Sequence, residues 1–419
     1  MLELTMLHLN NLYSFRRFAA LASLVLTLCI GIASCTQSDA PLPEEYVTLR
    51  IKVETGIPQN TSRATAPDSY EPAEGEFETI QTLRIIITKP GSAGTREVVA
   101  NKLVATSSTG YPTDKLEFKV LGNYRYRIYM IANEDILRSP DSKFATSRAF
   151  LDSFEENDIL NTTALANWTV AAPAVAPNIT GNIFSNYNNA QPGMPLTESF
   201  DVDVNIERTA SEDDPIFRRD ETVDVHLFLT RVACKASFNV NVSQDYKAKG
   251  VSITGIRLEN IDQSQYVFPR NATYNTGKNV SQLPEMDENG SFKVTDRYIT
   301  SFDSPQTNTL LNYPINLPAD SYVPVQAGAK ASFGPYYFPE TKFSDATTRF
   351  KVSVRLSDSD TWLTARPLTD NILVMQNNIQ GIARNTHLVV NIDFDGTDIT
   401  WKAIVAPYNT VTLEPSFGL

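Results

Sequence analysis

The sequence predicts an all-β protein built from two β-sandwich domains in tandem. Along much of its 419 residues, apolar and polar side chains alternate in short segments bounded by Gly, Pro, Asn, Asp or Ser, as expected for half-buried strands. A helical repeat of apolar residues is rare, and 152–165 is the best place for one short helix. A chain of this length suits two domains, each with a core of its own.

Five segments show the alternation most clearly. The first, 47–53, has apolar residues at odd positions and Thr, Arg and Lys at even ones. The others are 124–130, 200–206, 350–356 and 388–394. Because successive side chains of a strand point to opposite faces, each segment should bury one face.

The stretch 223–242 is longer than one ordinary strand. Its apolar residues fall on odd positions through Leu229 and on even positions from Val232 onward. A one-residue slip moves side chains to the other face, so we expect a bulge or sheet crossing near Arg231, with Cys234 as a buried core thiol. The domain boundary is placed just before this stretch, giving domains 64–222 and 223–419.

The N-terminus has the pattern of a lipoprotein signal. Arg16 and Arg17 precede an apolar run that ends in small residues and Cys35, and the run is short for a permanent membrane span. We therefore expect residues 1–34 to be removed, Cys35 to carry lipid, and the protein to work outside the cytoplasm. An uncleaved anchor with an incidental cysteine is the alternative.

Charge and cysteine content exclude several classes of function. Without 1–34 the chain has 34 basic and 47 acidic residues, a net charge of −13, which disfavours nucleic acid as a partner. The other two cysteines are Cys29, in the signal, and Cys234, so no internal disulfide is expected. With only His226 and His387 remaining, a His/Cys zinc site is disfavoured.

The segment 55–77 contains several Pro, Gly and acidic residues and almost nothing that could pack. It is predicted to be an exposed loop after the first strand. Arg63 is its only basic residue, so an Arg-specific protease would have one target there, between Arg63 and Ala64. An ordinary surface arginine is the alternative.

Catalytic signatures are absent from the sequence. It has no G-x-S-x-G elbow, phosphate-binding loop or G-x-G-x-x-G turn, and we expect no enzyme, no cofactor and no metal. The acidic segment 393–398 has a spacing that hard cations accept, but it lacks the distal glutamate of a complete loop, which favours a plain β-turn.

Several segments, in order, resemble the Bacteroidetes fimbrillin superfamily, whose members build or anchor lipoprotein-derived (type V) pili. Four features are similar to those of the family: the aromatic strand that ends in Ala-Asn (124–133), the Met-Pro turn (193–197), the strand with Arg followed by Ala and Lys (227–235), and the closing strands (384–387 and Trp401). Two positions depart from it, because a tyrosine is more usual at His387 and many members carry a tryptophan at Pro407-Tyr408.

The resemblance implies transthyretin-like, Greek-key β-sandwich domains and a maturation pathway. The precursor would be lipidated at Cys35 in the outer membrane and cut after Arg63, releasing a propeptide, 35–63, with the first strand. The open groove would then accept a strand from another fimbrial subunit, at the cell surface, in a fimbrium that contributes to adhesion. Implied partners are other subunits, the Arg-specific protease and the membrane.

Two C-terminal segments are candidate donor strands. Trp401 and Ala403 lie in one alternating segment, and Val411 and Leu413 lie in another. Each could equally be an ordinary closing strand of the second domain.

Two other functions stay open. If Arg63 is never cut, the chain would be a lipid-anchored fimbrial anchor that keeps its first strand. The second is a surface glycan-binding lipoprotein. Only the aromatic cluster 336–338 suggests this function, and an edge strand is the simpler explanation of the cluster.

Overall fold

A computed structural model describes residues 45–55, 80–105, 116–171, 194–205, 222–246, 250–270, 273–274, 285–286, 292–293, 299–301, 310–342, 350–368, 381–382, 384–406 and 412–413. Strands dominate these ranges, so the predicted all-β class is confirmed. Among the described residues, no helix has the length and apolar character needed to cross a membrane.

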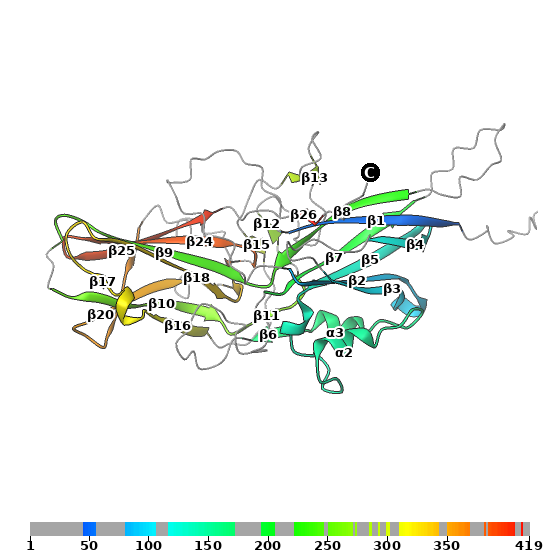
Figure 1. Ribbon diagram of the computed structural model, residues 1–419, viewed down its shortest axis with the longest axis horizontal. Helices are drawn as coiled ribbons and strands as arrows, with labels where there is room; N and C mark the ends of the chain where they lie inside the picture. The colour runs from blue at the N-terminus through cyan, green and yellow to red at the C-terminus, as the bar shows by residue number, and fades with distance from the viewer. Residues whose placement is uncertain are drawn as a thin grey trace, which may run out of the picture. The chain divides into compact units, whose positions relative to one another are not determined.

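One large sheet gathers the strands of the N-terminal half (Figure 1). Its order is β26-β1-β8-β7-β5-β2-β3, and β4 also pairs with β1. The bounds are β1 Tyr46–Thr55, β2 Thr82–Pro90, β3 Arg96–Ala105, β4 Glu117–Leu121, β5 Tyr124–Ala132, β7 Leu196–Val204, β8 Thr222–Arg231 and β26 Thr412–Leu413.

Two five-stranded sheets form the C-terminal half. The first has the order β16-β10-β20-β21 with β17 on β10, and the second β18-β9-β24-β25-β22. Their bounds are β9 Cys234–Val242, β10 Ser252–Asp262, β16 Leu310–Asn316, β17 Val323–Pro324, β18 Lys330–Phe338, β20 Lys351–Leu356, β21 Trp362–Thr364, β22 Arg366–Pro367, β24 His387–Asp395 and β25 Asp398–Ala406.

Short strands complete the structure in three small sheets, β11-β6, β12-β15-β23-β19 and β13-β14. They are β6 Thr169–Ala171, β11 Ser264–Tyr266, β12 Thr273–Tyr274, β13 Glu285–Met286, β14 Phe292–Lys293, β15 Ile299–Ser301, β19 Thr341–Lys342 and β23 Gly381–Ile382. In the part of the chain that the structure describes, 3-10 turns lie at Ser92–Gly94, Glu134–Ile136 and Ala319–Ser321.

The five clearest alternating segments are strands, as predicted. They lie in β1, β5, β7, β20 and β24, except that Asn205 and Phe350 flank β7 and β20 and that Ile206 lies outside the described residues. The break expected near Arg231 is also confirmed, because β8 ends at Arg231 and β9 begins at Cys234. Cys234 is fully buried, which raises the pKa of its thiol, so it is a core residue.

The single helix expected over 152–165 is wrong in its extent. Two short helices occur instead, α2 (Ser147–Asp152) and α3 (Thr162–Ala166). Thr146 and Asn161 cap them, each accepting a hydrogen bond from a backbone N–H three residues on. Between them, residues 157–160 hydrogen-bond to β3, which interrupts the helix.

Two apolar clusters form the cores. One contains inward side chains of β1, β2, β3, β4, β5, β7 and β8, so the large sheet curves around its own core. The other runs from Ile86 to Ala403 and joins the second face of β2, β3 and β5, the helices α2 and α3, and the C-terminal sheets. The boundary at 222/223 stays a prediction, because this second cluster contains residues from both sides of it.

Candidate strand-exchange site

The strand β1 is an integral part of the N-terminal core. Val47 is 3% exposed, and Leu49, Ile51 and Val53 are fully buried, whereas Thr48, Arg50 and Lys52 are half-buried. The alternation in the sequence therefore corresponds to one buried face. At about 1.5–3 kcal/mol for each buried aliphatic side chain, the four contribute on the order of 6–12 kcal/mol of burial.

On one side, β1 pairs with β8 in parallel. The register runs through eight pairs, from Thr48 opposite Thr222 to Thr55 opposite Leu229. Figure 1 shows the two strands side by side. Parallel pairing of segments more than 170 residues apart cannot be anticipated from a local pattern, because it depends on which sheet edge the strand reaches.

On the other side, β1 meets both β4 and β26. The Ile51 N–H donates to the carbonyl of Leu116, just before β4, at 2.9 Å. Beyond this point Val53 and Glu54 pair with β26 in antiparallel register. The first strand is thus an interior strand with neighbours on both sides, although it lies near the start of the chain.

One polar bridge spans the three strands. Arg50 lies 3.2 Å from a carboxylate oxygen of Glu117 in β4 and 3.3 Å from one of Asp224 in β8. All three side chains are partly exposed, and ion pairs of this kind contribute less than about 1 kcal/mol. Apolar burial and backbone pairing therefore hold β1 in place.

The space that β1 fills has apolar walls. Leu116, Phe118 and Val120 contribute from the β4 side, and Leu227 and Leu229 from β8, all in the same core cluster. Without β1, these side chains and the facing backbone groups of β4 and β8 would border an open channel of strand width. An unpaired edge of this kind is a template for strand addition.

The opposite edge of the sheet, β3, is built differently. Residues 157–160 cover its start through bonds that include Val98 N–H to Asp158 O, at 2.8 Å. Next to Val98 the pairing of β3 with β2 shifts register between Ile87 and Thr88. A covered start and a bulge are two of the devices by which proteins protect sheet edges.

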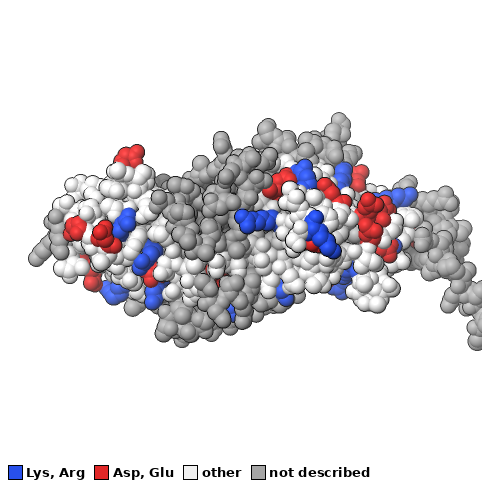
Figure 2. Space-filling model, turned by 90° about the horizontal axis from the view of Figure 1, so that it is seen from below, with Lys and Arg blue, Asp and Glu red and all other residues white. Residues whose placement is uncertain are grey.

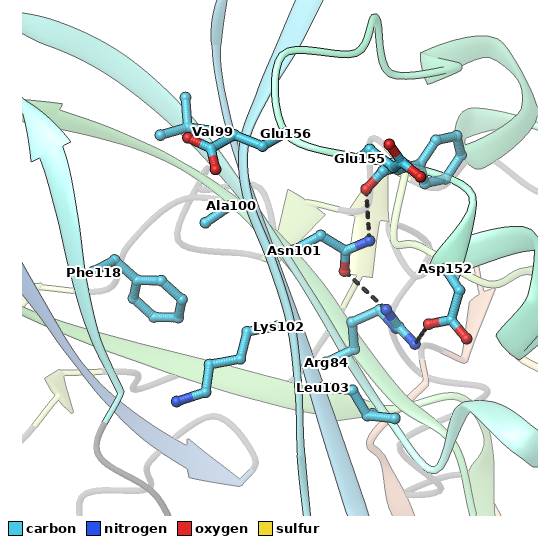
Figure 3. A pocket seen from close by; sticks show the side chains of 11 residues that line it. Arg84, Val99, Ala100, Asn101, Lys102, Leu103, Phe118, Asp152, Glu155 and Glu156 are labelled. Carbon is cyan, nitrogen blue, oxygen red and sulfur yellow. Dashed lines mark hydrogen bonds and ion pairs between the residues drawn. The ribbon is translucent and has the colours of Figure 1, made fainter.

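A hollow of about 550 Å³ lies along β3 (Figure 3). At its floor the buried Arg84 donates to both oxygens of Glu134, at 2.6 and 2.8 Å, to Asp152 at 2.6 Å and to Asn101 at 2.8 Å. Burial by itself would lower the pKa of Arg84, but the bonds to Glu134 and Asp152 raise it above its ordinary value. Its cation is already paired, and we assign no ligand to this hollow.

The predicted donor residues fall into different environments. Trp401 is 1% exposed and Ala403 is fully buried, within β25, which pairs with β24 over nine positions. Leu413 lies in β26, opposite Val53. Val411, the predicted lipidation site Cys35 and the predicted cleavage pair Arg63 and Ala64 lie outside the described residues.

The structure gives little support to a sugar-binding platform at 336–338. Tyr337 and Phe338 are 5% and 1% exposed, and Tyr336 packs on Phe238 with ring centroids 5.9 Å apart. These residues form the end of the edge strand β18. The cluster is therefore mostly part of the core.

The acidic segment near the end of β24 is a turn between strands. Asp393 and Asp395 accept hydrogen bonds from Asn241 and Ser243, both at 3.0 Å, and Gly396 has a φ of 54° in the left-handed region. Within the described ranges, no group of three or more His, Cys, Asp or Glu side chains is placed to hold a metal ion. Charges of both signs are interspersed on the described surface in Figure 2.

The sequence analysis missed a buried polar network. Arg384 donates to both oxygens of Glu340, at 2.5 and 3.0 Å, and to the carbonyl of Val267 at 2.6 Å. Glu198 in β7 is fully buried and is hydrogen-bonded to Thr230 of β8 at 3.4 Å. Glu198 shares a face of β7 with Phe200, and an acid on the apolar face of a strand was the available signal.

Desolvation dominates the protonation of Glu198. Burial raises the pKa of this carboxyl to about 8, although a backbone N–H, Arg384 and Thr230 favour its charged form. The side chain is therefore mainly protonated at neutral pH. Arg384 and Glu340 act on the Glu198 carboxyl through their charges, so this polar network couples the N-terminal sheet electrostatically to the C-terminal half.

Comparison with known proteins gives the following matches. No protein-family model and no curated protein matches the chain. It is similar to the tip fimbrial protein Mfa3 from Porphyromonas gingivalis with C-terminal truncation, at 11% identity over 87% of this chain and 100% of that chain, with a TM-score of 0.44.

Two structures from Parabacteroides distasonis are also similar. A candidate cell adhesion protein shares 15% identity over 88% of this chain and 98% of that chain, with a TM-score of 0.42. A fimbrial assembly protein shares 12% identity over 87% and 100%, with a TM-score of 0.37. These are fimbrial and adhesion proteins.

Proposed function

We propose that this protein is a structural subunit of a cell-surface fimbrium, assembled by exchange of its first strand. The precursor is lipidated at Cys35 and cut between Arg63 and Ala64, β1 leaves with the propeptide, and an extended segment of another subunit takes its place. The observation that carries the proposal is that β1, next to the predicted cleavage loop, is an interior strand with a fully buried apolar face.

The geometry supports this exchange in physical terms. Loss of β1 would leave backbone groups of β8 and β4 unpaired and apolar walls exposed to water, which is unfavourable for an isolated subunit. A strand with apolar residues at alternate positions would restore both kinds of contact. Main-chain hydrogen bonds then supply affinity, and the alternating side chains set the register.

Of the two predicted donors, the segment of Val411 and Leu413 fits the proposal better. Trp401 and Ala403 already fill the C-terminal core, and β25 is joined to β24 by a tight turn. Withdrawing β25 would open that core, whereas β26 pairs over only two positions. Partners would be other fimbrial subunits, the outer membrane through the lipid before cleavage, and the Arg-specific protease.

The test is Arg63→Ala in the full chain, expressed in a cell that assembles the fimbrium. We expect a folded, lipidated protein that forms neither fibres nor SDS-resistant ladders, because β1 still fills its place. Arg125→Ala, at an arginine whose side chain is 62% exposed, is the matched control and should assemble normally. Arg63→Lys separates protease classes, since an Arg-specific enzyme would not cut it and a trypsin-like one would.

Fibres formed by Arg63→Ala protein would overturn the cleavage step. A lipid-anchored fimbrial anchor is the alternative that the same geometry allows, because an uncut chain keeps β1 as a permanent interior strand. The N-terminal sequence and mass of protein from its native cell surface distinguish the two. A start at Ala64 without lipid indicates a polymerising subunit, and a lipidated start at Cys35 indicates the anchor.

A further inference from the structure

The outer side of β1 is divided between two neighbours. Its first part meets β4, where the Ile51 N–H is bonded to Leu116 O at 2.9 Å. Its last part meets β26, with Val53 opposite Leu413 and Glu54 opposite Thr412. The strand that fills the channel therefore also pairs with the C-terminal segment of the same chain.

The sequence around β26 alternates in a similar way to β1. Apolar residues stand at 411, 413 and 417, with Thr412, Glu414 and Ser416 between them, and Pro415 occupies the remaining position, where it cannot donate a hydrogen bond to a neighbouring strand. In β1 the corresponding positions are 47, 49, 51 and 53. In the uncut chain, positions 412 and 413 of this segment thus lie against β1, the strand that the segment would replace in a neighbouring subunit.

We propose that β1 restrains both halves of the exchange: it fills the acceptor channel between β8 and β4, and it holds the C-terminal donor segment at 412–413. This regulation rests on the proposed function. One cut after Arg63 then frees the acceptor and the donor of the same subunit together, and an uncut subunit offers neither.

The small size of the contact supports release. In the sheet order β26 is the terminal strand, and its neighbour is β1. The two paired positions that the structure describes are by themselves too few to persist as a separate structure, since even a two-stranded hairpin is marginal in water. When β1 leaves, the segment loses the strand on which its pairing depends.

A cysteine pair tests the contact in the uncut chain. Directly opposite residues of an antiparallel ladder have Cα atoms about 4.5–5.5 Å apart, which suits a disulfide. Glu54→Cys with Thr412→Cys should therefore cross-link under mild oxidation, as read by peptide mass spectrometry. Cys29 and Cys35 are replaced by serine in both variants, and the native Cys234 is fully buried, so no other exposed thiol competes.

The matched control is Lys52→Cys with Thr412→Cys. It lies two residues out of register, with a Cα separation of about 8 Å, beyond disulfide range. We expect at least about tenfold less cross-linking than for the in-register pair. Equal cross-linking in the two variants, or none in the in-register pair, would overturn the proposed contact.

A second experiment separates this inference from the proposed function. The chain carries Arg63→Ala and the recognition sequence of a site-specific protease inserted after Ala64, so that β1 is released without the native enzyme. Intact mass verifies loss of the fragment, and hydrogen exchange is measured on peptides that cover 406–419, with the uncut variant as control.

In subunits that remain monomeric, exchange at 412–413 should accelerate at least about tenfold when β1 is gone, whereas in fibres a segment paired with a neighbour would be protected again. No acceleration in the monomer fraction would overturn the inference. If exchange at 412–413 accelerates but no fibres form, strand exchange would be overturned as the function. The inference that β1 restrains the C-terminal segment would still hold.

Discussion

The strands β1 and β25 are alike in sequence and unlike in attachment. Both lie near an end of the chain and bury one alternating face, with Ile51 in β1 and Trp401 in β25 at the centre of their cores. The strand β25 forms a hairpin with β24 through nine paired positions, whereas β1 pairs with segments distant in the chain and precedes the predicted cleavage loop. A buried strand can be exchanged when its covalent connection to the chain can be cut and when its removal opens no core other than the channel that the incoming strand fills.

The largest loss of stability should come from a substitution in β25, the strand that we regard as permanent. Trp401→Ala removes a buried side chain that packs against Phe350 with ring centroids 5.6 Å apart, and we expect a loss of about 3–5 kcal/mol in the free energy of unfolding. Urea denaturation measures it. Lys402→Ala, at the next position, should change stability by no more than about 0.5 kcal/mol. Near-native stability of Trp401→Ala would contradict a core role for β25.

The corresponding change in β1 should depend on cleavage. Ile51→Ala should destabilise the uncut protein by about 2–5 kcal/mol, because it leaves a cavity in a fully buried position. In assembled fibres lacking the propeptide it should have no effect on stability. Lys52→Ala serves as the control. If Ile51→Ala weakened mature fibres as much as the precursor, β1 would be a permanent strand like β25.

The buried carboxyl of Glu198 in β7 should make the free energy of unfolding depend on pH. Folding raises the pKa of Glu198 from 4.5 to about 8, so the folded state holds a proton that the unfolded state releases between these values. Its contribution to stability is therefore full below about pH 4.5 and decreases as the pH rises toward 8, by up to about 1.4 kcal/mol per pH unit.

Glu198→Gln keeps the shape of the side chain and removes the titration. Its unfolding free energy, measured by urea denaturation from pH 5 to 8, should lack this part of the decline. Asp203→Asn, on the same strand at a side chain that is 60% exposed, is the control and should retain the decline. Identical slopes for the wild type and Glu198→Gln would show that Glu198 titrates normally.

The smallest effect is expected at the polar bridge over β1. Arg50→Ala should cost less than about 1 kcal/mol, and less still at high salt, because Arg50 and its two carboxylate partners, Glu117 and Asp224, are partly exposed. Thermal unfolding of the uncut protein at low and high salt measures the difference. A loss comparable to that of Ile51→Ala would mean that electrostatics, rather than burial, retains β1.

Local patterns predicted the strands better than the helical region. The alternation in 47–53 identified both the strand and its buried face, since the two-residue repeat of a strand assigns each side chain to a face. The helix expected over 152–165 was wrong because Asn161 caps a new helix and 157–160 pair with β3, contacts made by a distant strand. The polar network escaped notice because Glu340 and Arg384 become partners of the β7 region only in the folded chain.

The sequence by itself determined which segments form strands and which face of each is buried, because these properties depend on neighbours one and two residues away. The tertiary structure alone decided that β1 pairs in parallel with β8, that Trp401 belongs to a closed core, and that Leu413 lies opposite Val53. The pairings of β1 with β8 and with β26 join segments more than 150 residues apart. Their choice depends on which edges and apolar faces remain to be covered once the rest of the chain has packed.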